Sequence, residues 1–131
     1  MENPLEKLLV SHVELDRELV ATILADLVRI DKDTGEIRFT MDGAKLSNKL
    51  RILTYLLARK AAKALNLVPE EPISSSELTS QLGISGGSLR GQLSLLNGER
   101  LIDKREGKYF VPNYSVEQVK TLIDQAAGKG K

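Results

Sequence analysis

The side chains best suited to binding a partner lie between residues 85 and 108. Arg90 can donate two parallel hydrogen bonds to a guanine edge, and Gln92 can pair with adenine. Lys104, Arg105 and Lys108 follow in a short charged stretch, and such cations can neutralise phosphates without reading a base sequence. These residue types suit contacts with nucleic acid, although charges in a short hairpin turn are also common on any solvated surface.

Other kinds of site have little support in the sequence. The 131 residues include no cysteine and one histidine, His12, which excludes thiolate chemistry and sites that need two imidazoles. The acids Asp31, Asp33 and Glu36 lie around Gly35 but lack the twelve-residue calcium-loop pattern, so a hairpin turn explains them better. No phosphate-binding glycine loop and no nucleophile motif occur. We therefore predict a protein without enzymatic activity, metal or cofactor.

Charge and hydropathy bound the partners further. The net charge is +1, so a basic coat over the whole surface is excluded, and any charge-driven binding must come from local clusters. Residues 1–44 are acidic overall, whereas residues 45–131 are basic overall. No apolar run approaches the roughly 20 residues that span a bilayer, and no basic segment precedes an apolar stretch at the start. These features predict a cytoplasmic protein without membrane contact.

The first 44 residues predict two helices and a hairpin. Apolar residues spaced by three and four favour a short helix near 4–12 and a second helix near 16–26, capped by Asp16. Period-two alternation in 28–30 and 37–39, with a glycine between them, predicts a β-hairpin. We therefore interpret residues 1–44 as an acidic extension.

The strongest helical pattern covers residues 45–66. Its main apolar stripe consists of Leu46, Leu50, Leu53, Leu57, Ala61 and Ala64. Ile52 and Leu56 form a second apolar edge, and the basic residues, Lys60 among them, are expected at the edges and the outer face. This helix is expected to lie between the two halves of the chain. Together with the N-terminal apolar residues Leu5, Leu8 and Leu9, the second edge also predicts a homodimer.

The remaining residues predict further helices and a second hairpin. A capping box of Ser74 and Glu77 opens a helix over 75–82 that ends at Gly83, and Ser85 caps a helix over 86–97 with a leucine face. A hairpin follows, with arms at 101–102 and 109–111 around a charged turn over 103–108. A capping box of Ser115 and Gln118 opens a closing helix. Residues 128–131 are expected to be disordered.

This order of elements resembles the winged helix-turn-helix DNA-binding superfamily over residues 45–114. The resemblance is carried by the segment 73–85, by Leu89, Leu93 and Leu96, and by Leu101 and Ile102 with residues 107–111. It implies an α+β fold in which the second helix of the motif enters the major groove and the hairpin, or wing, contacts adjacent backbone. The DNA-binding positions that it implies are Ser85, Gly86, Gly87, Ser88, Arg90, Gly91, Gln92, Ser94 and Asn97, with Lys104, Arg105 and Lys108 on the wing.

Taken together, these patterns predict an α+β protein. Its expected parts are a helix-plus-hairpin extension (1–44), a winged-helix domain with a C-terminal closing helix (45–127) and a short tail (128–131). We expect non-enzymatic binding of double-stranded DNA in a regulatory or accessory role. The alternative is a winged-helix scaffold that docks a protein partner through the glycine-lined face of 86–97 or through the acidic extension.

The three glycines within 86–97 are open to two explanations. Each interior glycine costs a helix about 0.5–1 kcal/mol relative to alanine, so their presence needs a reason. Either the missing side chains allow close approach to DNA or a protein, or Gly86 and Gly87 occupy a tolerant first turn while Gly91 packs against another helix. A related question is where the helix ends, because Arg100 stands where this superfamily often has glycine, and Asn97-Gly98 is expected to supply the turn.

Overall fold

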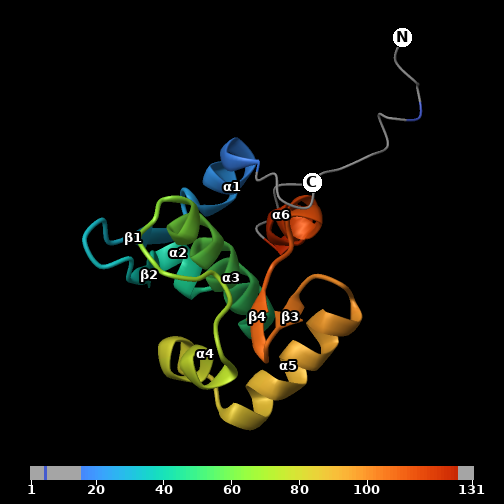
Figure 1. Cartoon of the computed structure of the whole chain (residues 1–131). Coiled ribbons are helices and arrows are strands. Elements are labelled where there is room, and N and C mark those ends of the chain that lie inside the picture. The colour runs from blue at the N-terminus through green and yellow to red at the C-terminus, as the bar shows by residue number, and fades with distance from the viewer. Residues whose placement is uncertain (1–4, 6–15, 127–131) are drawn as a thin grey trace.

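The computed structural model describes Leu5 and residues 16–126, which form a mixed α+β fold (Figure 1). The expected helix near 4–12, His12 and the tail at 128–131 lie outside these residues. The elements are α1 (Arg17–Leu24), β1 (Val28–Ile30), β2 (Ile37–Phe39), α2 (Met41–Ala44), α3 (Asn48–Ala64), α4 (Ser75–Leu82), α5 (Gly86–Gly98), β3 (Asp103–Arg105), β4 (Lys108–Phe110), the 3-10 turn η2 (Asn113–Ser115) and α6 (Val116–Ala126).

The first helix and the first hairpin agree with the sequence pattern. The Asp16 side chain accepts a hydrogen bond from the Leu19 amide at 3.0 Å, which caps α1. Strands β1 and β2 pair antiparallel, with Ile30 opposite Ile37. In their loop, Asp31 Oδ1 accepts bonds from the amides of Asp33 and Thr34 at 2.8 and 2.9 Å. These hydrogen bonds hold the pKa of Asp31 below its ordinary value. The Asp31 carboxylate therefore serves to stabilise the turn.

Helix α3 begins later than the sequence pattern predicts. Thr40 and Ser47 each accept a backbone hydrogen bond and cap two separate helices, α2 and α3, where we had expected one helix from residue 45. Short α2 packs tightly on the chain that leaves α1. A Cβ atom added to Gly43 would lie 2.1 Å from the Leu27 carbonyl oxygen. Glycine is therefore required at this contact.

Helix α3 lies at the centre of the molecule. Side chains from α1, α4, α5 and α6 join its apolar residues in a single core cluster, and Ile52 and Leu56 are fully buried there. The expectation that these two residues form a second, free apolar edge is therefore wrong, and it no longer supports self-association. Lys60 was expected at an edge or on the outer face, but it is buried.

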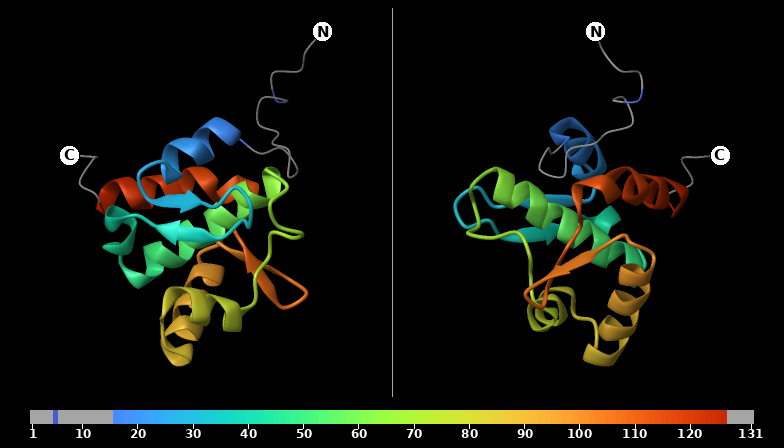
Figure 2. Two further views of the ribbon diagram at one scale, coloured as in Figure 1. Left: turned by 90° about the vertical axis from the view of Figure 1, so that its left-hand side faces the viewer. Right: turned by 45° about the vertical axis from the view of Figure 1, so that its right-hand side comes forward.

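The helices separate toward two ends of the molecule. Helices α1, α3 and α6 pack against one another, whereas α4 and α5 lie together at the opposite end (Figures 1 and 2). None of the helices between residues 16 and 126 has the length and apolar character needed to cross a membrane.

The start of α6 differs from the capping box expected at Ser115. The Ser115 side chain is buried, and its hydroxyl donates to the Arg100 carbonyl at 2.7 Å instead of capping α6. The turn η2 precedes α6 directly. Ser115 therefore ties the start of α6 to the chain that follows α5, a contact between distant residues that a local motif does not encode.

Candidate nucleic-acid interface

Helices α4 and α5 begin and end at capping and turn residues that can be recognised in the sequence. Ser74 Oγ accepts from the Glu77 amide at 3.2 Å, and Ser85 Oγ accepts from the Ser88 amide at 3.4 Å, so each serine caps a helix. Between the helices, Gly83 has φ +67°, a left-handed conformation that favours glycine. The predicted helices and caps are confirmed here.

The leucines of this pair point inward, and the predicted contact positions divide by exposure. Leu78 and Leu82 are buried together with Leu89, Leu93 and Leu96. Ser85 is used as a cap, and Gly86 and Gln92 are half-buried. The exposed positions on and before α5 are Ser85, Gly87, Ser88, Arg90, Gly91, Ser94 and Asn97. Gln92 is therefore less accessible than the sequence suggested.

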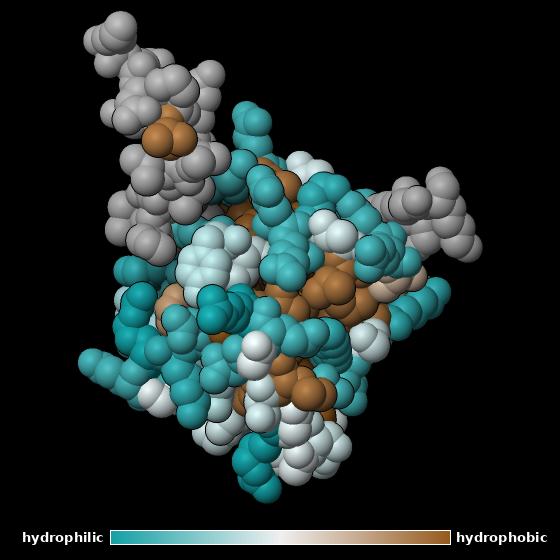
Figure 3. Space-filling model, turned by 90° about the vertical axis from the view of Figure 1, so that its right-hand side faces the viewer, coloured by the Kyte–Doolittle hydropathy of each residue, from teal (hydrophilic) through white to brown (hydrophobic). Residues whose placement is uncertain are grey.

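Apart from Arg90 and Leu95, the exposed face of α5 consists of small or uncharged polar residues. A Cβ atom added to Gly87, Gly91 or Gly98 would meet no atom within 4 Å. The expectation that Gly91 packs against another helix is therefore wrong. Leu95 on the same helix is 62% exposed. In Figure 3 the lower end of the molecule, where α4 and α5 lie, carries many pale, near-neutral residues beside a brown apolar area.

Helix α5 ends in a way that the sequence did not indicate. The Arg100 amide bonds to the Asn97 carbonyl and the Leu101 amide to the Leu96 carbonyl, at 3.1 and 3.0 Å, which is the Schellman pattern. Arg100 holds the left-handed position of this motif with φ +62°, whereas Asn97 and Gly98 remain helical. The expectation that Asn97-Gly98 makes the turn is therefore wrong.

The second hairpin has a shorter turn than expected, and its first strand begins later, at Asp103. Lys104 pairs with Tyr109, and Arg105 pairs with Lys108. We had placed 103–108 in a charged turn, but the turn is only Glu106-Gly107. Both of its residues have positive φ, which is the geometry of a tight two-residue hairpin. Leu101 and Ile102, the expected first arm, are buried just before β3.

A backbone contact places this hairpin beside the helix pair. Ile73, just before α4, forms an antiparallel bridge with Tyr109 in β4, through two hydrogen bonds of 3.0 and 2.8 Å. The segment that leads into α4 is thus held beside β4 at one bridged residue. Figure 2 shows the hairpin in orange next to α4 and α5.

Two cations of β3 are held over aromatic rings. Lys104 Nζ lies 5.3 Å from the Tyr109 ring centroid, and the Arg105 guanidinium lies 4.7 Å from that of Phe110. Such contacts orient a cation without cancelling its charge. Among the described residues neither cation forms an ion pair, so both charges remain accessible to an anion.

Lys108 differs from these two cations because it is already paired. Its ammonium group forms an ion pair and a hydrogen bond with Glu70, in the segment between α3 and α4. The pairing raises the pKa of Lys108 and lowers that of Glu70. The sequence analysis missed Glu70, because 38 residues separate the partners and no local pattern links them. Lys108 is therefore the least available of the three cations on this hairpin.

The comparisons give no relative from which a role could be carried over. No protein-family model, curated protein or solved structure matches the chain.

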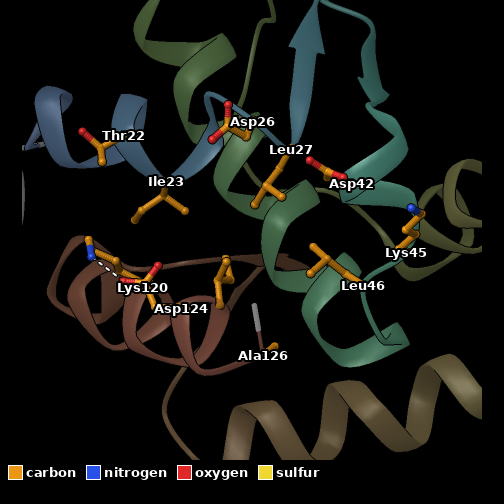
Figure 4. A pocket seen from close by; sticks show the side chains of 11 residues that line it. Thr22, Ile23, Asp26, Leu27, Asp42, Lys45, Leu46, Lys120, Asp124 and Ala126 are labelled. Carbon is orange, nitrogen blue, oxygen red and sulfur yellow. Dashed lines mark hydrogen bonds and ion pairs between the residues drawn. The ribbon is translucent and has the colours of Figure 1, made fainter. Parts of the chain in front are cut away.

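A cavity lies at the other end of the molecule, away from α4 and α5. It has a volume of about 610 Å³ and opens between α1, α2 and α6, with Ile23 and Leu27 among its apolar residues and Asp26, Asp42 and Lys45 around them (Figure 4). Within the described ranges, no three acidic or histidine side chains gather as metal ligands would.

Proposed function

We propose that the chain is a winged-helix protein that binds double-stranded DNA through α5 and the β3–β4 hairpin, in a regulatory or accessory role. The observation that carries this proposal is the bridge between Ile73 and Tyr109. It joins the segment before α4 to the hairpin after α5, which is the arrangement that gives a recognition helix an adjacent wing.

The distribution of free cations supports the same surface. Arg90 on α5 and Lys104 and Arg105 on β3 are exposed and lack carboxylate partners among the described residues. The other described lysines and arginines include five in ion pairs: Arg38, Lys49, Lys60, Lys108 and Lys120. Other described cations, such as Arg17 and Arg29 on the α1 side, are also outside the ion pairs. What favours this surface is that its three free cations stand on one helix and on the hairpin that follows it.

The proposed mode of binding is mainly to the DNA backbone. Arg90 is the only basic residue in the sequence of α5, so one side chain is available for a bidentate guanine contact. Lys104 and Arg105 would hold phosphates and fix the orientation of the helix. The open glycine face lets the α5 backbone approach the groove closely. This combination favours weakly selective binding.

The experiment is a titration of duplex DNA against protein at several salt concentrations. Lys104→Gln and Arg105→Gln should each make the slope of log K against log salt shallower by about 0.9, the value for one lost phosphate contact. The control, Glu70→Gln/Lys108→Gln, removes a pair that is already neutral and should leave the slope nearly unchanged. An absence of duplex binding at low salt, or an unaltered slope in the Lys104→Gln/Arg105→Gln double variant, refutes the proposal.

One observation favours a second candidate function, the docking of a protein. Leu95 is 62% exposed on the helix that carries the open glycines, and an apolar side chain beside small residues suits a close protein contact. The variant Leu95→Glu separates the two functions. It adds a negative charge to a face that would pack on a protein, so it should abolish protein docking, whereas it should weaken duplex binding only through repulsion of phosphates.

A further inference from the structure

An apolar groove runs along the side of α1 that faces away from the cavity in Figure 4. It has a volume of about 330 Å³ and is formed by α1, β1 and the C-terminal end of α3. Its lining is aliphatic, and Ala21, Ala25 and Leu65 expose apolar surface there; Leu65 is 60% exposed. A groove of this kind leaves apolar area in water that a further segment could cover.

Two arginines give this groove a positive character. Arg17 lines it and is exposed, at the first turn of α1. Arg29 lines it from β1, and one of its guanidinium nitrogens donates to the carbonyls of Ala25 and Val28 at 2.6 and 2.8 Å. Neither arginine forms an ion pair within the described part of the chain. The groove therefore suits an occupant that is apolar and carries acidic groups.

The chain itself contains a segment of this composition directly beside the groove. Residues 6–15, which lie outside the described residues, read Glu-Lys-Leu-Leu-Val-Ser-His-Val-Glu-Leu. They join α1 at Asp16, next to Arg17 in the groove. Because the segment joins α1 directly, it must reverse direction to lie beside α1, and such a turn takes about 2–5 residues. The remaining five to eight residues span about 8–12 Å as a helix, against about 12 Å for the eight residues of α1, so the segment can follow most of the groove.

We propose that residues 6–15 dock in the α1–β1–α3 groove of their own chain. Leu8, Leu9 and Val13 would then cover the aliphatic lining, and Glu6 and Glu14 would face the arginines. A short tether gives the segment an effective concentration in the millimolar range, so docking in the same chain outcompetes docking in a second copy at micromolar protein. The proposal is independent of DNA binding, because the groove lies on α1 and not on α5.

The absence of cysteine from the chain allows a direct test by disulfide crosslinking in the full-length protein. The test pair is Leu9→Cys with Ala21→Cys, and the matched control is Leu9→Cys with Thr22→Cys. Ala21 and Thr22 are neighbours on α1 and are both exposed, but Ala21 lines the groove and Thr22 lines the other cavity. The same two partners, Ala21→Cys and Thr22→Cys, are also combined with Leu8→Cys and with Val13→Cys. The outcome then does not depend on which residue of the segment faces Ala21.

Crosslinks are read on non-reducing gels, which separate bonds within a chain from bonds between chains. We expect the groove pairs to close within one chain about tenfold faster than the Thr22→Cys pairs, which corresponds to a preference of about 1.4 kcal/mol. Equal rates for the two sets would overturn the proposal. Crosslinked dimers as the main product would also overturn it and would assign the groove to a second copy.

Discussion

Lys60 and Glu71 form an ion pair in the interior, with Nζ 2.9 Å from Oε2 and side chains only 6% and 19% exposed. The ammonium group also donates to Asn113 Oδ1 at 2.7 Å. Within the described part of the chain, the Lys60 ammonium group is the partner that the buried Oε2 atom of Glu71 has. The pair joins α3 to the segment before α4 and to the turn before α6.

Loss of one partner of this pair should destabilise the protein strongly. Glu71→Gln leaves the buried ammonium group of Lys60 without its carboxylate, and Lys60→Met leaves the Glu71 carboxylate without its cation. Breaking a buried ion pair in this way lowers the free energy of unfolding by about 3–5 kcal/mol. The double variant Lys60→Met/Glu71→Gln should lose less than the sum of the two. Urea denaturation measures these changes. As a control, Arg38→Gln breaks the exposed pair with Glu36 and should change little.

Arg100→Gly should stabilise the protein. The left-handed conformation costs a residue with a side chain roughly 1–2 kcal/mol. Glycine avoids this cost but loses about 0.5–1 kcal/mol through its freedom in the unfolded chain, so a net gain of about 0.5 kcal/mol is expected. Thermal denaturation provides the measurement. Arg100→Ala keeps the strain, and an equal gain in that variant would show that the conformation is not the cause.

Replacement of Gly91 and of Gly43 by alanine should change the stability of the protein in opposite directions. Gly91→Ala adds a methyl group in open space, and it should stabilise α5 by about 0.5–1 kcal/mol. Gly43→Ala pushes the same group against the Leu27 backbone, and overpacking of this kind costs about 1–3 kcal/mol. Chemical denaturation of the two single variants compares them. A destabilised Gly91→Ala would mean that α5 contacts a neighbour at that position.

The ion pair between Glu70 and Lys108 should contribute to the loss of folding stability at acidic pH. The pKa of Glu70 is lowered from its ordinary value of 4.5, chiefly by the hydrogen bond from Lys108. The stabilisation is therefore present above about pH 4.5 and is lost as the pH falls through the lower pKa of the folded state. A carboxyl titration by NMR should show the Glu70 pKa rising toward 4.5 in Lys108→Gln. An unshifted Glu70 pKa in that variant would contradict the pairing.

Arg90→Gln should reduce discrimination between DNA sequences more than it reduces overall binding. A bidentate guanine contact is worth about 1–3 kcal/mol on a preferred site and much less on random duplex. Selection of a preferred duplex from a random pool, followed by titration of both, measures the difference. Equal losses on preferred and random DNA would place Arg90 on a phosphate instead.

Local signals made much of the fold predictable. The caps Asp16, Ser74 and Ser85 stand next to the helices that they begin, and Gly83 stands at the turn, so neighbouring residues suffice to place them. The hairpin turn of Asp31 follows from the same kind of short-range pattern.

The features that sequence reasoning missed depend on distant partners. Lys60 is buried because Glu71 and Asn113 meet its charge, and Lys108 is engaged because Glu70 reaches it from another segment. Ser115 and Gln118 have the spacing of a capping box, yet the Ser115 hydroxyl donates to the distant carbonyl of Arg100. Periodicity gives the direction in which a side chain points but not which group it meets. The division of the chain into an extension that ends at residue 44 and a domain that begins at residue 45 stays a prediction.

The central position of α3 has a consequence for how the chain comes apart. Its buried side chains belong to one cluster with residues on both sides of it in sequence, from Val20 to Ile123. Neither half can keep its apolar contacts if this helix leaves, so opening at either end should propagate to the other in one cooperative step. The amides of Ile52 to Leu57 should accordingly exchange with solvent only when the whole molecule unfolds, as the slowest group in the protein.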